Sequence, residues 1–86
     1  METRQMSPIT LQRFVTELDK LKHEVDAGTL LPRNYDGRLA RIIQELRECG
    51  LDADRATATA ALADAVTRGV ISASVQAHLQ TRLGLA

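Results

Sequence analysis

Residues 52–69 read DADRATATAALADAVTRG, and this stretch decides the fold class. It has the strongest helical composition in the chain, with alanine at positions that fall on nearly every face of a helix. Because alanine is small, neighbouring helices can approach such a segment closely. We therefore predict a helix over 52–68, begun by Asp52 and ended by Gly69, as the slender central element of an all-helical domain.

The first of three further helices has a well-marked start. Ser7 suits the N-cap position and Pro8 suits the first turn, where its missing N–H costs nothing. Gly28 suits the left-handed residue just beyond the end, which predicts a helix over 7–27. Apolar residues that should face the core recur there at three- and four-residue steps, at Leu11, Phe14, Val15, Leu18, Leu21 and Val25.

The same signals predict two more helices, over 35–49 and 72–83. Gly50 and Gly84 suit their ends, and residues 29–35 then connect the first two helices. The apolar positions are Leu39, Ile42, Ile43 and Leu46 in one helix and Val75, Leu79 and Leu83 in the other. No stretch shows the two-residue alternation of a strand, so the sequence indicates an all-α fold, packed as a small four-helix bundle or an orthogonal helical array.

Length and composition bound the class of protein. We assign 7–86 to a single all-helical domain and expect 1–6 to be a disordered tail. Only two residues are aromatic, so the core is thin, and a second copy often supplies the missing apolar burial in such small domains. The net charge is zero, and no run suits a signal peptide or a membrane span. We therefore expect a cytoplasmic protein without a membrane partner.

The sequence offers no constellation for catalysis or for a cofactor. His23, His78 and Cys49 stand in separate segments, without the spacing that places two metal ligands on one helix face. Cys49 lies at a helix end, where the negative end of the dipole disfavours a reactive thiolate. Asp64 is best explained by an ion pair with Arg68, four residues on. We therefore expect no enzyme activity, no metal and no cofactor.

A basic cluster lies at the end of the connector and in the second predicted helix, at Arg33, Arg38 and Arg41. Such a cluster could contact phosphates. Three acidic residues are interleaved with it, however, namely Asp36, Glu45 and Glu48. A mixed, solvated face is therefore the simpler interpretation.

A helix-turn-helix unit over 61–82 is the most specific functional pattern. Its usual small residue, turn glycine and two aliphatic positions are matched by Ala65, Gly69, Val70 and Val75. The side chains that would then project toward DNA are Ser74, Gln76, Gln80 and Arg82. Polar residues occupy three positions that are usually apolar, namely Asp64, Arg68 and His78. A DNA-binding transcriptional regulator is therefore the alternative function.

Recognition of another protein is the leading hypothesis. If one chain does not bury the alanines of 52–68, they form an apolar strip of a kind that is uncommon on monomers, with Ala58, Ala61 and Ala65 as its candidates. A second candidate patch in the connector is formed by Leu30, Leu31 and Tyr35, which could instead plug the end of the bundle. We expect a small non-enzymatic interaction, regulatory or adaptor module that presents a helical surface to itself, as a homodimer, or to a partner protein.

Overall fold

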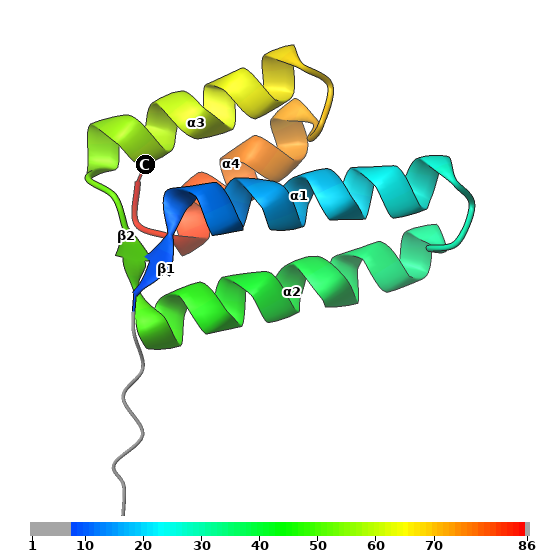
Figure 1. The fold of residues 1–86 in the computed structure, drawn as a ribbon, viewed down its shortest axis with the longest axis horizontal. Coiled ribbons are helices and arrows are strands. Elements are labelled where there is room, and N and C mark those ends of the chain that lie inside the picture. The colour runs from blue at the N-terminus through cyan, green and yellow to red at the C-terminus, as the bar shows by residue number, and fades with distance from the viewer. Residues whose placement is uncertain (1–7, 86) are drawn as a thin grey trace, which may run out of the picture.

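The computed structural model describes residues 8–85, which contain four helices and two very short strands. Their order is β1 (Ile9–Thr10), α1 (Leu11–Asp26), α2 (Pro32–Cys49), β2 (Leu51–Asp52), α3 (Arg55–Thr67) and α4 (Ala73–Arg82) (Figure 1). Helices make up 73% of the structure, which confirms the predicted all-α class. The tail predicted over 1–6 and the proposed N-cap Ser7 lie outside the described residues.

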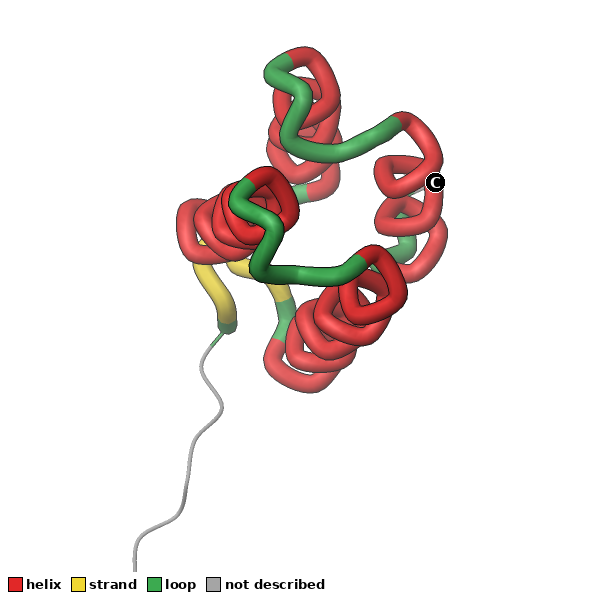
Figure 2. Tube along the Cα trace, turned by 90° about the vertical axis from the view of Figure 1, so that its right-hand side faces the viewer, coloured by secondary structure: helices red, strands yellow, loops and turns green. Residues whose placement is uncertain are grey.

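The four helices lie side by side, with their axes roughly parallel or antiparallel to one another. Viewed along the bundle, α3, α1, α2 and α4 follow one another around the centre (Figure 2). α1 packs against α2 and α3, and α3 packs against α4. Of the two predicted arrangements, the structure is therefore the bundle. None of the described helices is both long enough and apolar enough to cross a membrane.

The alanine-rich helix α3 is not the central element that we predicted. It occupies one corner of the bundle (Figure 2) and buries a single face, formed by Ala58, Leu62 and Ala65. Of its four other alanines, Ala61 is half-buried, and Ala56, Ala60 and Ala63 are exposed. Because alanine favours a helix whether it is buried or exposed, alanine on every face predicts the helix but not its place in the fold.

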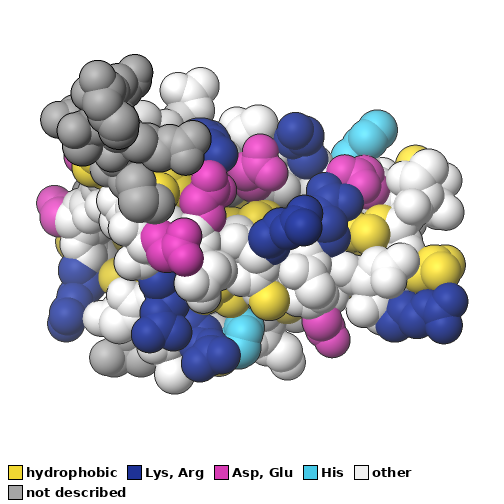
Figure 3. Space-filling view, turned by 90° about the horizontal axis from the view of Figure 1, so that it is seen from below, with side chains coloured by type: hydrophobic (Ala, Val, Ile, Leu, Met, Phe, Trp, Pro, Cys, Tyr) yellow, Lys and Arg dark blue, Asp and Glu magenta, His cyan; other side chains and the backbone are white. Residues whose placement is uncertain are grey.

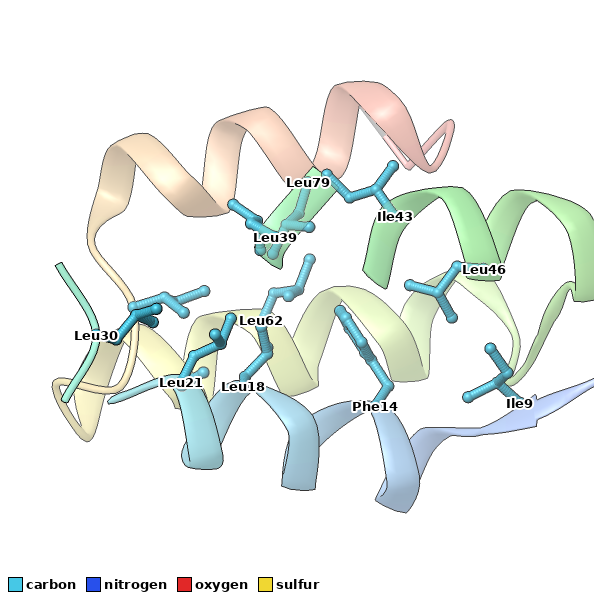
Figure 4. Close-up of a cluster of buried hydrophobic side chains, with 12 residues drawn as sticks. Ile9, Phe14, Leu18, Leu21, Leu30, Leu39, Ile43, Leu46, Leu62 and Leu79 are labelled. Atoms are coloured by element: carbon cyan, nitrogen blue, oxygen red, sulfur yellow. The ribbon is translucent and has the colours of Figure 1, made fainter. Parts of the chain in front are cut away.

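The core lies between the four helices and is built of aliphatic side chains around Phe14 (Figure 4). The centre of each predicted apolar stripe is buried, including Phe14, Leu18 and Leu21 of α1, Leu39, Ile43 and Leu46 of α2, and Leu79 of α4. Val25, at the end of the α1 stripe, is instead exposed. Leu30 from the connector closes that end of the core in its place.

Glycines end three of the helices as predicted. Gly28, Gly69 and Gly84 each have a positive φ just beyond a helix, and the N–H of the following residue donates to a carbonyl five residues back. This is the Schellman ending. Gly50 differs, because its φ of 86° and ψ of 155° lie outside the left-handed helical region. Its carbonyl accepts the N–H of Ile9 at 2.8 Å, so the chain leaves α2 directly into β2.

The two strands form a parallel pair that we did not predict. Ile9 is in register with Leu51, and Thr10 with Asp52. The helix start predicted at Pro8 is therefore wrong, as is the helix start predicted at Asp52. Each strand is only two residues long, and its partner is distant in the sequence. No local alternation of apolar and polar residues can reveal such a pair.

The helix starts follow from side-chain caps close to the predicted positions. The Thr10 hydroxyl caps α1 by accepting an N–H at 3.1 Å, and the Asp54 carboxylate caps α3 by accepting the N–H of Thr57 at 2.7 Å. Ser72, one of two predicted candidates, caps α4. α2 begins at Pro32, three residues before the predicted start, because proline is well suited to the first helical position.

Candidate functional site

The charged side chains of the described residues lie on the surface. No polar or charged side chain in 8–85 is buried, and no three His, Cys, Asp or Glu residues of that range are grouped closely enough to hold a metal ion. The predicted ion pair between Arg68 and Asp64 is present at 2.7 Å, and Arg68 also reaches Asp19 of α1 at 3.5 Å. Arg68 thus links the end of α3 to α1 on the surface.

The three alanines proposed as a binding strip on α3 do not share one environment. Ala58 and Ala65 are fully buried against the core, and Ala61 is half-buried. In this chain, Ala58 and Ala65 therefore contribute to the packing of α3 on its neighbours. Only Ala61 retains surface that another molecule could touch.

The four residues proposed to contact DNA lie on two flanks of α4. Ser74 and Arg82 are exposed on one flank, whereas Gln76 and Gln80 are half-buried on the other, since successive residues turn by about 100° around a helix. The exposed face between them carries the short side chains of Ala73, Ala77 and Thr81. In addition, α3 and α4 run side by side in opposite directions (Figure 1), whereas a helix-turn-helix sets its helices at a steep angle.

The connector between α1 and α2 separates its two neighbouring leucines. The Leu30 N–H donates to the carbonyl of Glu24 at 3.2 Å, and the Leu30 side chain is only 8% exposed. Leu31 has extended backbone angles, with φ of −74° and ψ of 149°. Consecutive side chains of an extended chain point to opposite sides. Leu31 therefore faces outward and is 49% exposed, more than Val25, the other exposed large hydrophobic residue of the described chain.

Tyr35, the third residue of the predicted connector patch, is half-buried and packs against the core. Burial raises the pKa of its hydroxyl, and the nearby carboxylate of Asp36 raises it further. The predicted patch thus divides into two roles. Leu30 and Tyr35 close the end of the bundle, and Leu31 is left in solvent.

A shallow hollow of about 490 Å³ lies on the first half of α2, close in the sequence to Leu31. It is lined by Leu30, Arg33, Asn34, Gly37, Arg38 and Arg41. Gly37 leaves its floor open, since a Cβ built there would meet no atom within 4 Å. Positions 33, 37 and 41 are spaced by four residues, so they follow one another along one side of the helix. On the side of the molecule where α2 lies, basic and acidic side chains are interspersed with exposed hydrophobic atoms (Figure 3).

An ion pair between helices neutralises one of the three arginines. Arg38 donates to both carboxylate oxygens of Glu24 on α1, at 3.0 and 3.1 Å. These hydrogen bonds lower the pKa of Glu24 and raise the pKa of Arg38, because each ion stabilises the other. Arg38 is therefore committed to the contact between α1 and α2.

None of the three acidic residues interleaved with the arginines pairs with Arg33 or Arg41. Glu45 pairs with Arg13 of α1 at 3.1 Å, Glu48 accepts a hydrogen bond from Gln44, and Asp36 lines a separate hollow beside His78 of α4. Arg33 and Arg41 form no ion pair with any residue of the described range. The mixed face predicted from the sequence is thus only partly neutralised.

The combination of these features was not predicted from the sequence. The signal is present in residues 30–41, LLPRNYDGRLAR, as two leucines followed by arginine, glycine and arginine at four-residue spacing. It can be recognised only once Leu31 is known to be exposed and Arg33 and Arg41 are known to form no ion pair within the described residues. Comparisons of the chain with protein-family models, curated proteins and solved structures found no match.

Proposed function

We propose that this protein is a non-enzymatic interaction module that binds an acidic segment of a partner protein. The binding surface consists of Leu31, Arg33, Gly37 and Arg41, and we call it the Leu31 surface. One observation carries the proposal. The most exposed large hydrophobic residue of the described chain, Leu31, stands in the sequence between Leu30 and Arg33, which both line a hollow where Arg33 and Arg41 have no carboxylate partner among the described residues.

The two parts of the surface would contribute differently to binding. Leu31 is about half exposed, so covering the rest of it contributes on the order of 1 kcal/mol. Ion pairs at Arg33 and Arg41 would lie at the solvated rim and add roughly 0.2–1 kcal/mol each. Such a surface supports a weak, reversible contact, in which the leucine anchors the partner and the arginines select for acidic residues.

The charge of the surface favours a different partner over a second copy of this chain. In a symmetric dimer the same patch of both copies meets itself. Two Leu31 surfaces facing one another would bring the unpaired Arg33 and Arg41 of both copies together without acidic partners. A segment carrying Asp or Glu beside an apolar side chain complements both features at once.

The proposal can be tested with a library of random peptides displayed on phage and selected on the whole protein. We expect enriched peptides to carry an apolar residue flanked by Asp or Glu. Synthetic copies should bind less well to Leu31→Asp and to the double variant Arg33→Glu/Arg41→Glu. They should also bind less well to Gly37→Leu, which fills the floor of the hollow where there is open space.

Arg55→Glu is the matched control, because Arg55 is also exposed and forms no ion pair within 8–85, but lies at the start of α3. Circular dichroism would establish that each variant is folded. Peptides without acidic residues, or equal affinity for the wild-type protein and the Leu31→Asp variant, would refute the proposal. Self-association abolished by Leu31→Asp would instead identify a second copy as the partner.

A further inference from the structure

A second hollow lies at the opposite end of the bundle from the Leu31 surface, where the ends of α2 and α4 meet β2. Its volume is about 450 Å³. The apolar side chains of its lining are those of Leu46, Leu51, Ala53, Ala58, Leu83 and Leu85. Cavities that bind small molecules fall in the same range of volume and are mostly apolar with a few polar groups.

Two arginines supply the charged part of this lining. Arg47 lies in the last turn of α2 and Arg82 in the last turn of α4. The negative end of each helix dipole favours a positive charge at these positions. Neither arginine pairs with an acidic residue of the described range, and no Asp or Glu of that range lines the hollow. The hollow therefore combines apolar walls with two positive charges that have no counter-charge among residues 8–85.

We infer that this hollow binds a small amphipathic carboxylate. Its apolar body would lie against the leucines and its carboxylate between Arg47 and Arg82. The planar guanidinium group donates two parallel hydrogen bonds to a carboxylate, and charged hydrogen bonds of this kind are among the strongest in proteins. Arg82, considered from the sequence as a DNA contact, thus has its place beside an apolar hollow. The inference does not depend on the Leu31 surface, with which this hollow shares no residue.

The test is a titration of the full-length, ¹⁵N-labelled protein, followed by the amide shifts of Leu51, Ala53 and Leu85, which line the hollow. Sodium octanoate should cause saturable shifts at these residues. 1-Octanol has the same apolar body without the charge and should bind at least about tenfold more weakly. Acetate has the charge without the body and should cause no saturable shift.

Arg47→Gln and Arg82→Gln should each weaken octanoate binding about two- to fivefold, as expected for the loss of an ion pair at an exposed arginine. Arg55→Gln should leave the affinity unchanged, because Arg55 is exposed but does not line the hollow. All three side chains are exposed, so the variants are expected to fold. Shifts that do not saturate, equal binding of octanol, or unchanged affinity in both arginine variants would overturn the inference.

Discussion

Replacing each of the two neighbouring leucines by alanine should separate folding from binding. Leu30 is almost completely buried, whereas Leu31 is about half exposed. We expect Leu30→Ala to destabilise the fold strongly and Leu31→Ala to leave it nearly intact. The affinity for the peptides selected on the Leu31 surface should nevertheless fall in Leu31→Ala.

The magnitudes follow from burial. Truncating a buried leucine costs about 2–5 kcal/mol, and Leu30 lies at the end of the core, where neighbours can relax, so about 2–3 kcal/mol is expected. Leu31 keeps half of its surface in water, so its truncation should cost no more than about 1 kcal/mol. For a domain of this size, 1 kcal/mol shifts Tm by about 4–8 °C. The Leu30→Ala variant should thus melt roughly 10–20 °C lower.

Urea unfolding followed by circular dichroism measures both variants, provided that the m value is unchanged. A loss of about 1 kcal/mol in peptide binding corresponds to a roughly fivefold weaker Kd for Leu31→Ala. If Leu31→Ala lost as much stability as Leu30→Ala, this would indicate that both leucines pack into the core at the end of the bundle. The assignment of Leu31 to a binding surface would then be wrong.

Packing, backbone conformation and ionisable groups each lead to a further prediction about the stability of the fold. Ala65→Leu should lower the free energy of unfolding by about 1–3 kcal/mol, because Ala65 is completely buried; an unchanged urea midpoint would contradict this packing. Gly69→Ala should lower the free energy of unfolding by about 1 kcal/mol, because Gly69 has a φ of 78°. Gly37→Ala, within α2, should instead raise it by roughly 0.5–1 kcal/mol, because alanine fits the helix and meets no atom there. Effects of the same sign would contradict the backbone conformations of these two glycines. Hydrogen bonds lower the pKa of Glu24 and of Asp54, so their stabilisation is present above the unfolded pKa of about 4 and is lost as the pH falls through the lower folded value. Tm should therefore fall on acidification, and less steeply in Glu24→Gln and Asp54→Asn; equal slopes would exclude these two groups as the cause.

Local signals in the sequence predict the helices well. Glycines at 28, 69 and 84 end helices as expected, because only a residue without a side chain adopts the positive φ that a Schellman ending needs at no cost. Apolar spacing likewise predicts which side of each of α1 and α2 is buried. These features depend on residues within one turn of each other, so the sequence carries them directly.

Features that depend on distant residues were not predicted. Gly50 ends α2 but its carbonyl bonds to Ile9, and this contact replaces the expected joint with a short strand. The place of α3 at a corner depends on which surfaces α1 and α2 leave uncovered. Leu30 and Leu31 are identical residues, and only the turn after Gly28 decides which of them enters the core.

The charges of the candidate site also depend on residues that are distant in the sequence, and this leads to a last prediction. Glu45 could pair with Arg41, one turn before it on α2, but pairs with Arg13 across the α1–α2 contact, which leaves Arg41 available. Arg13→Ala should therefore release Glu45 to neutralise Arg41. An exposed pair of this spacing contributes about 0.3–0.5 kcal/mol, so acidic peptides should bind about twofold more weakly although the Leu31 surface itself is unchanged. The loss should vanish in Arg13→Ala/Glu45→Gln, and a loss that persists in this double variant would show that Arg13 acts in another way.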